Sequence, residues 1–360
     1  MSSARAPHPV TRSTSSSVLI VRLGALGDVV HAMPVVAALR EAWPTADVGW
    51  LVQAPYADLV RRLDGVSQVH AVRGRLDTQA LRQVRHARYD VCLDLQGLLK
   101  SALWARASGA HRVIGFSRAV AREPLASALY GETGGVASGH VIDRNLSLLP
   151  RLGIVTQGRP RVRLSVPAST SADSARTLLG GREVPFALLN AGAGWPNKRW
   201  PATRFGELAD RLLDAHGLRS LVVWGPGEAS LAAAVVRASK RSAAVMAPES
   251  NILDVLALAS VAQVVVAGDT GPLHLAAAVE APLVGLYGPT PPDRNGPWAP
   301  DDLCVSRHDR CACVFKRRCT ADIWCLGEVT VEDVALAVSR RLAVRTGDAP
   351  PQDARGVPPA

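Results

Sequence analysis

The most informative run in this sequence is Val264-Val265-Val266-Ala267-Gly268-Asp269-Thr270-Gly271-Pro272-Leu273-His274-Leu275-Ala276. It begins with uncharged, mostly β-branched residues, which predict a strand that is buried on both faces. The strand breaks at Gly268, and a helix is expected to follow with Pro272 in its first turn, where a missing backbone N–H costs nothing. Such a unit binds anions, because free N–H groups and the helix dipole point at one spot.

Asp269 is expected at the C-terminal tip of this strand, the edge at which open α/β sheets bind ligands. A negative side chain beside an anion site favours contacts to the hydroxyl groups of a ligand over contacts to its phosphates. The alternative is a plain connection between strand and helix that is capped by the aspartate, because a lone glycine-containing turn is a weak motif.

The same alternation of strand and helix runs along most of the chain. Strands are expected at 18–21, 48–52, 69–72, 89–95, 186–190, 220–224 and 282–287, the last of these being the final strand. Helices are expected at 29–43, 56–63, 76–86, 205–216 (with Gly217 as its C-cap), 252–260 and 331–345. This alternation predicts an α/β protein built on parallel, doubly wound sheets.

The pattern loosens between residues 155 and 170, so we predict two Rossmann-like domains, 18–160 and 161–345, that face a central cleft. The flanking segments 1–17 and 346–360 are rich in Ser or Pro and are expected to be disordered. A length of 360 residues fits two domains.

The net charge of +10 comes from 41 basic and 31 acidic residues, and it is unevenly distributed. Residues 1–165 hold 21 Lys or Arg and 11 Asp or Glu, whereas residues 166–360 hold 20 of each kind. A basic first half indicates an anionic partner, which leaves nucleic acid, phospholipid and phosphorylated sugar open. Aromatic residues make up only 4%, so stacking platforms for single-stranded nucleic acid are scarce.

No run is long and apolar enough for a spanning helix, and Arg22, Asp28 and His31 interrupt the one run that imitates a signal peptide. We therefore expect a cytoplasmic protein. Cys92 lies in an apolar strand and is expected to be inert. Five further cysteines cluster between 304 and 325, where we favour reduced thiols, with a structural metal or disulfides as alternatives.

A second glycine-containing turn, Gly24-Ala25-Leu26-Gly27-Asp28, follows the first expected strand. Its spacing differs from the dinucleotide-binding fingerprint Gly-x-Gly-x-x-Gly. Asp28 would open a helix, with His31 about one turn later on the same face. The pair is either a capping aspartate with a surface histidine or a carboxylate that acts as a general base.

The second half carries a loop of small residues, Gly192-Ala193-Gly194, which lets a ligand approach the backbone closely. Lys198 follows that loop and offers a point charge to a phosphate, and Glu228 follows the next strand, where it could bind a ribose diol. The alternatives are an exposed basic loop and an exposed carboxylate.

Together these residues resemble glycosyltransferase family 9, the ADP-heptose:lipopolysaccharide heptosyltransferases, over roughly residues 18–338. The segments that carry the resemblance, in order, are 22–31, 94–101 (Asp-Leu-Gln-Gly-Leu-Leu-Lys-Ser), 198–201 (Lys-Arg-Trp-Pro) and 268–276. The resemblance implies the GT-B fold and inversion of the anomeric centre. It implies no cofactor and no metal at the donor site, and the sequence contains no Asp-x-Asp pair of the kind that holds a divalent ion in metal-dependent transferases.

The resemblance also implies roles for individual residues. Asp28 matches the catalytic base. The donor-binding residues are Lys198 on the diphosphate, Glu228 on the ribose, Asp269 on the donor sugar, Thr270, Gly271 and His274 beside it, and the loop Gly192, Ala193 and Gly194. Some family members carry hydroxyl residues in that loop. This sequence has none there, so any phosphate contact from its loop would come from the backbone. Acceptor-binding candidates are Gly27, His31, Arg61, Arg62 and Lys100.

The implied reaction transfers heptose from ADP-heptose to a Kdo–lipid A or heptosylated inner-core acceptor of lipopolysaccharide. A monomer in peripheral contact with the cytoplasmic face of the inner membrane, without nucleic acid, is expected. Three other functions remain open at this point: a sugar-nucleotide 2-epimerase of the same fold, a nicotinamide oxidoreductase, and a non-enzymatic protein that binds nucleic acid or other anions.

Overall fold

The computed structural model describes residues 17–346 except residues 75 and 323. The two segments expected to be disordered lie outside the described residues, except that Ser17 begins the first strand and Thr346 ends the last helix. The chain divides between Arg163 and Leu164 into two compact units, each with its own sheet. The cleft that the sequence predicts between the two domains stays a prediction.

Within the described part of the first unit, six parallel strands form one sheet in the order β3-β2-β1-β4-β5-β6. The strands are β1 (Ser17–Val21), β2 (Asp47–Gln53), β3 (Gln68–Val72), β4 (Val91–Asp94), β5 (Arg112–Phe116) and β6 (Glu132–Gly134). This is the Rossmann order, and its direction reverses between β1 and β4. Ligands bind such sheets at the carboxyl ends of the two strands that flank the reversal.

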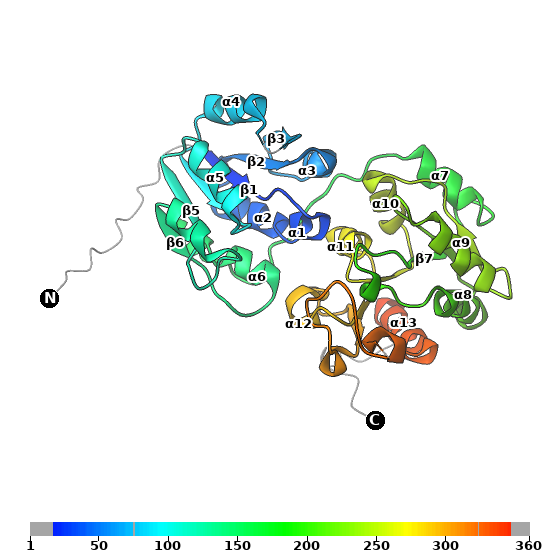
Figure 1. Cartoon of the computed structure of the whole chain (residues 1–360). Coiled ribbons are helices and arrows are strands. Elements are labelled where there is room, and N and C mark those ends of the chain that lie inside the picture. Colours follow the sequence, from blue (N-terminus) through cyan, green and yellow to red (C-terminus); the bar gives the residue numbers. More distant parts are fainter. Residues whose placement is uncertain (1–16, 75, 323, 347–360) are drawn as a thin grey trace. The chain divides into compact units, whose positions relative to one another are not determined.

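The helices of this unit follow its strands in the blue to green part of the chain (Figure 1). They are α1 (Leu26–Val30), α2 (Met33–Ala42), α3 (Ala57–Val60), α4 (Thr78–Ala87), α5 (Leu99–Ala107) and α6 (Val141–Leu146). Shorter 3-10 turns are η1 (Ala54–Tyr56), η2 (Pro124–Leu129) and η3 (Leu149–Leu152). Leu19 and Val21 of β1 share a buried cluster with residues of α4 and α5, so these two helices cover one face of the sheet. Helices α2 and α6 pack against each other.

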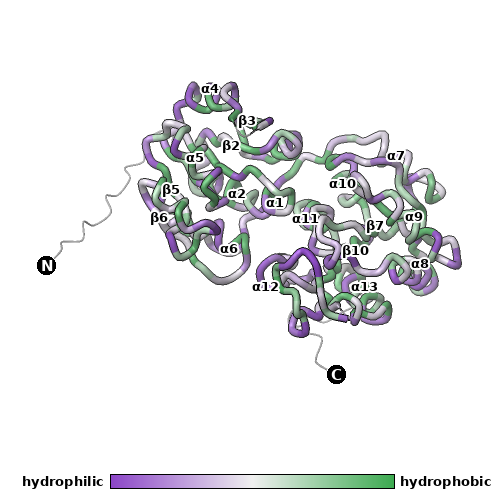
Figure 2. The backbone as a smooth tube through the Cα atoms, in the orientation of Figure 1, coloured by the Kyte–Doolittle hydropathy of each residue, from purple (hydrophilic) through white to green (hydrophobic). Residues whose placement is uncertain are grey.

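The second unit repeats the architecture, with the order β12-β11-β10-β7-β8-β9 in the described residues. Its strands are β7 (Phe186–Asn190), β8 (Arg219–Val222), β9 (Ala244–Met246), β10 (Val264–Gly268), β11 (Leu283–Tyr287) and β12 (Leu303–Ser306). Here the order reverses between β7 and β10. Every residue of these two central strands is buried, and Figure 2 shows their apolar character.

Helices cover both faces of this second sheet. They are α7 (Thr170–Thr177), α8 (Ala202–His216), α9 (Ala229–Ala238), α10 (Ile252–Ala259), α11 (Gly271–Ala278), α12 (Pro292–Asn295) and α13 (Val331–Thr346). Shorter 3-10 turns are η4 (Pro196–Lys198), η5 (His308–Arg310) and η6 (Cys325–Glu328). Residues of α8, α9 and α13 share one buried cluster with Val264 and Val266. Helix α11 packs on β10 and β11 and against α10, which in turn contacts α7. Because side chains alternate along a strand, Val265 and Ala267 point to the opposite face from Val264 and Val266.

The predicted strands and most of the predicted helices are present, and Gly217 caps α8 with the left-handed φ of 67° that glycine accepts most readily. The single helix predicted over 29–43 is wrong. Helix α1 ends at Val30, and α2 begins at Met33 with Pro34 in its first turn. A continuous helix would have placed the Pro34 ring against the carbonyl of Val30, so the break is a steric consequence of that proline.

The strand at 282–287 is not the final strand, because β12 pairs with β11 at the edge of the second sheet. In the portion of the chain that the structure covers, we find no helix with both the length and the apolar character needed to cross a membrane.

Candidate active site

The turn after β10 places Asp269 at the reversal point of the second sheet, beside the carboxyl end of β7. Its side chain is buried and receives contacts on both oxygens. Oδ2 lies 2.5 Å from Lys198 Nζ and accepts a hydrogen bond of 2.7 Å from Thr290 Oγ1. Oδ1 lies 3.0 Å from His274 Nε2. Asp269 therefore caps no helix, and the alternative of a plain capping aspartate is wrong; Thr270 is the N-cap residue of α11.

The charge on Asp269 follows from these contacts. Burial alone would raise the pKa of Asp269, but the hydrogen bond and charge of His274, followed by those of Lys198, hold that pKa well below its usual range. The carboxylate is thus ionised throughout the physiological pH range, and it offers a fixed negative charge to hydroxyl groups.

Lys198 lies at the end of η4, on the loop that follows β7. Its side chain is only 14% exposed, and Nζ lies 4.6 Å from the centroid of the Trp195 ring. Packing against an aromatic face and pairing with Asp269 hold the ammonium group at this edge of the sheet. The alternative of a merely exposed basic loop is wrong for this lysine.

The first turn of α11 supplies backbone donors beside the same carboxylate. Among the described residues no side chain caps this helix, and Pro272 occupies its first turn, so the start of α11 keeps backbone N–H groups of the kind that bind anions. Asn190 lies at the end of β7. Its Nδ2 donates a hydrogen bond of 3.2 Å to Thr270 Oγ1 and one of 3.3 Å to the carbonyl oxygen of Gly192. This buried amide ties the small-residue loop to the helix start, and sequence reasoning missed it.

Glu228 lies directly over the small-residue loop. A Cβ placed on Gly192 would sit 1.9 Å from Glu228 Oε2, so any larger residue there would displace the Glu228 carboxylate. Oε2 of Glu228 accepts a hydrogen bond of 3.1 Å from the Gly225 N–H, and Oε1 of Glu228 lies 3.8 Å from Arg199 Nη2. Nε of Arg199 also donates a hydrogen bond of 2.9 Å to the carbonyl oxygen of Ala193. Glu228 therefore packs against the loop at Gly192, whereas Gly194 has open space around it.

In the first unit, Asp28 lies in the first turn of α1, close to the carboxyl end of β1. The N-cap of α1 is Ala25, so the alternative of a capping aspartate is wrong. The Asp28 side chain is 26% exposed, and its Oδ1 lies 2.8 Å from Arg22 Nη2. His31 is not a surface residue: it is buried, and its ring lies edge-on to His140 with 5.6 Å between centroids.

The remaining acceptor candidates lie on the surface of the same unit. Arg61 pairs with Asp58, and the side chains of Arg62 and Lys100 are exposed. Gly27 lies within α1, where its carbonyl accepts from the His31 N–H. Within the described residues, no hydrogen bond or ion pair joins Arg61, Arg62 or Lys100 to another of these candidates.

Two charged or polar contacts at these strand ends escaped the sequence analysis. Thr290 comes from the turn after β11 and reaches Asp269, and Arg22 comes from the end of β1 and reaches Asp28. The sequence carries a signal for Arg22, which is a charged residue at the end of an apolar strand and the first residue of the family-like segment 22–31, but no role follows from the sequence for it. Nothing marked Thr290.

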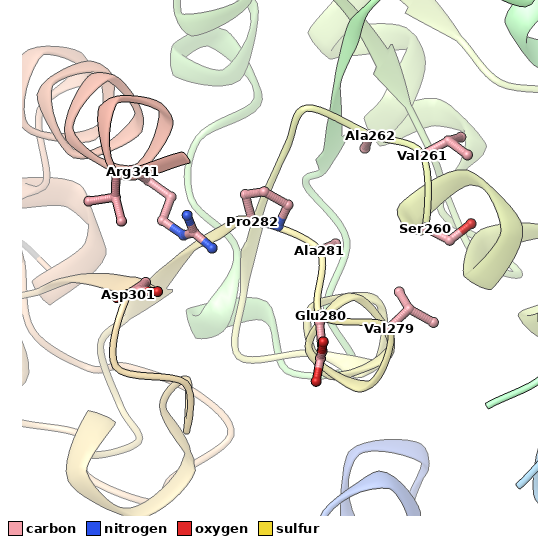
Figure 3. Close-up of a pocket in the computed structure, with 10 residues that line it drawn as sticks. Ser260, Val261, Ala262, Val279, Glu280, Ala281, Pro282, Asp301 and Arg341 are labelled. Atoms are coloured by element: carbon pink, nitrogen blue, oxygen red, sulfur yellow. The ribbon is translucent and has the colours of Figure 1, made fainter. Parts of the chain in front are cut away.

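The pocket drawn in Figure 3 lies where the strands of the second sheet begin, at the opposite end of these strands from Asp269. Its lining residues Ala262, Pro282 and Asp301 lie one or two residues before the starts of β10, β11 and β12, whereas Asp269 follows β10. Its volume is about 360 Å³. Because open α/β sheets bind ligands at the carboxyl ends of their strands, this hollow is not the substrate site.

All six cysteines are free thiols, and Sγ of Cys311 lies 3.6 Å from Sγ of Cys313. Burial and the neighbouring Cys311 raise the pKa of Cys325 to about 12, so this thiol stays protonated. Among the residues that the structure covers, no three Cys, His, Asp or Glu side chains are arranged to hold a metal ion.

The comparisons with known proteins agree with this geometry. Residues 78–325 match the model of glycosyltransferase family 9 (heptosyltransferase). The chain is 30% identical over 322 residues to lipopolysaccharide heptosyltransferase 1 of Pseudomonas aeruginosa, covering 84% of this chain and 87% of that protein.

Two solved structures show the fold. The Escherichia coli heptosyltransferase WaaC with ADP has a TM-score of 0.70 at 24% identity, and the match covers 92% of this chain and 99% of that one. The E. coli ADP-heptose lipopolysaccharide heptosyltransferase II has a TM-score of 0.74 at 20% identity, with the same coverage. The predicted GT-B fold of two Rossmann-like domains is thereby confirmed, and the chain belongs to glycosyltransferase family 9, the heptosyltransferases.

Proposed function

We propose that this enzyme transfers heptose from ADP-heptose to the Kdo residue of the lipopolysaccharide inner core, with inversion at the anomeric carbon. The observation that carries the proposal is the cluster of Lys198, Asp269 and His274 beside the uncapped start of α11. It combines a cation and open N–H groups for a diphosphate with an ionised carboxylate for sugar hydroxyls.

The donor would bind entirely on the second unit. The diphosphate would contact Lys198 and the N–H groups of Thr270 and Gly271, since a lysine and a helix start both favour anionic oxygens. Asp269 would accept hydrogen bonds from the heptose, with His274 holding its other oxygen. Glu228 would accept bonds from the ribose, and Gly192, Ala193 and Gly194 would contact the nucleotide through their backbone.

The chemical step needs a base and a stabilised leaving group. Asp28 would take the proton from the acceptor hydroxyl as that oxygen attacks the anomeric carbon from the face opposite the diphosphate. The bond from this carbon to the diphosphate oxygen breaks, and ADP leaves with its negative charge stabilised by Lys198 and the start of α11. Closure of the two domains around both substrates would exclude water, which otherwise hydrolyses the donor.

The acceptor is proposed to bind the first unit, which carries the whole basic excess of the sequence. Arg61, Arg62 and Lys100 present exposed cations, and Gly27 and His31 lie beside Asp28 in the chain. Kdo–lipid A bears carboxylates and phosphates that would pair with such side chains. We propose further that the enzyme is a cytoplasmic monomer. Peripheral contact with the inner membrane would bring it to a lipid-anchored acceptor.

The test is an acceptor-dependent assay with purified protein, ADP-heptose and Kdo–lipid A. We expect ADP release only when both substrates are present, and a product heavier than the acceptor by one heptose. An already heptosylated acceptor run in parallel distinguishes the first transfer from a later one. Release of a modified sugar without any acceptor would instead indicate an epimerase, and absence of ADP release with either acceptor would contradict the proposal.

A further inference from the structure

Arg22 is a buried charge at the end of β1, at the reversal point of the first sheet. Only 6% of the residue is exposed. Nη2 lies 2.8 Å from Asp28 Oδ1, and Nη1 donates to the carbonyl of Leu95, just past the end of β4. The guanidinium thus joins the two strand ends that flank the reversal, and its Nη2 pairs with the carboxylate of Asp28.

The segment 94–101, in which only Lys100 has a proposed role, builds the other side of this contact. The carboxylate of Asp94 accepts from the N–H of Gln96 at 2.8 Å, from Ser101 Oγ at 2.8 Å and from Tyr130 OH at 2.8 Å. Gln96 Oε1 in turn accepts from the N–H of Leu23 at 2.9 Å. These bonds fix the turn after β4 against the chain after β1, and they aim the Leu95 carbonyl at Arg22.

Stability alone does not account for this arrangement. Within the described residues Nε of Arg22 is buried without a hydrogen-bond partner, which costs free energy. The partner carboxylate is 26% exposed, and a partly buried ion pair of this kind returns little after desolvation. Unsatisfied buried polar groups of this kind are expected at functional or strained sites.

The geometry also divides the two oxygens of Asp28. Oδ1 faces the guanidinium, and within the described residues no hydrogen bond or ion pair engages Oδ2. The guanidinium group is planar, and one of its nitrogens is fixed by the carbonyl of Leu95. Its other terminal nitrogen therefore restricts the orientation of the carboxylate with which it pairs. One oxygen is then anchored, and the other is free to accept a proton.

We propose that Arg22 is a positioning residue for Asp28, with the segment 94–101 as its support, so that Oδ2 faces the acceptor hydroxyl. This inference rests on the proposed role of Asp28 as the base. It assigns the buried residues Asp94, Gln96 and Ser101 of the second family-like segment to the orientation of that base, whereas the exposed Lys100 of the same segment keeps its proposed contact to the acceptor.

The test compares Arg22→Met, Arg22→Lys, Asp28→Asn and the double variant Arg22→Met/Asp28→Asn. We expect Arg22→Met to lower kcat by about 100-fold, the usual cost of a misplaced catalytic group, and Arg22→Lys to restore part of that loss. The dissociation constant of ADP, which binds the other unit, should stay unchanged. The double variant should be no slower than Asp28→Asn alone, because an arginine that acts only through Asp28 has nothing left to orient.

Chemical rescue keeps the test decisive if the methionine variant folds poorly. Guanidinium added to Arg22→Ala should raise kcat in a saturable manner, and it should have no effect on Asp28→Asn. Multiplicative losses in the double variant, or full activity of Arg22→Met, would overturn the inference. If Asp28→Asn itself turns over normally, the proposed base fails, and that outcome is separate from a failure confined to the arginine variants.

Discussion

The Asp269→Asn variant is expected to bind ADP more tightly than the natural protein and to transfer heptose more slowly. Without ligand, the carboxylate lies 2.5 Å from Lys198 Nζ, so the lysine must give up or share this ion pair when a diphosphate arrives. The amide keeps the size of the side chain and can still accept from Thr290. It removes only the charge that competes with the diphosphate for the lysine.

The magnitude follows from burial. The side chains of Lys198 and Asp269 are 14% and 4% exposed, so water screens their contact weakly. A charge-assisted bond contributes about 1.5–3 kcal/mol, and we take the lower end because His274 and Thr290 also hold the carboxylate. Since about 1.4 kcal/mol is tenfold in Kd, the Kd of ADP should fall by about tenfold. Loss of a charged contact to the heptose should lower kcat/KM by about 10- to 100-fold.

Titration calorimetry with ADP measures the first effect, and initial rates of ADP release measure the second. Asp301→Asn is the matched control, because this exposed aspartate lies at the opposite edge of the same sheet and should leave both values unchanged. An unchanged or weaker affinity of Asp269→Asn for ADP would refute the reasoning, since the lysine would then be equally available with and without the competing carboxylate.

Three further predictions concern the loop, pH and salt. Gly192→Ala should weaken ADP binding because the added Cβ meets Glu228 at 1.9 Å, while Gly194→Ala, with open space around it, should bind ADP normally in the same calorimetric titration. The folded-state pKa of Asp269 is depressed below its ordinary 3.8, so its stabilisation is present above about pH 4 and is lost as pH falls through the folded-state pKa. The difference in Tm between the natural protein and Asp269→Asn should therefore shrink in scans below pH 4, and a constant difference would contradict the depressed pKa. Raising salt should increase the KM of acceptor more than that of donor, since exposed charges are screened over about 8–10 Å, and Lys100→Ala should act in the same direction; equal salt effects on both substrates would remove the argument from charge.

Much of the fold could be predicted because its central strands carry strong local patterns. Strand β10 is a β-branched run that ends at a glycine and is followed by a proline, so strand, turn and helix start each have a signal within a few residues. The edge strand β12 has four residues, only one of them buried, and its pattern is correspondingly weak. The break between α1 and α2 was missed because both halves are apolar, although Pro34 held the information.

The site could be predicted only as far as the residues lie next to recognisable turns. Asp269 and His274 are five positions apart, and Asp28 follows its turn directly, so each could be found from the local sequence. Thr290 reaches Asp269 from the turn after the neighbouring strand, and Arg22 reaches the carbonyl of Leu95 across the sheet. Those contacts depend on strand order, which a single sequence does not state.

The measurement that tests the central claim most directly is the structure of the reaction product. Purified protein, ADP-heptose and Kdo–lipid A are incubated to completion, and the glycolipid is analysed by mass spectrometry and by NMR of its anomeric proton. We predict one added heptose on Kdo, with the anomeric configuration opposite to that of the donor. A product with retained configuration would contradict a single displacement assisted by Asp28, and a glycolipid without added heptose would contradict the transfer itself.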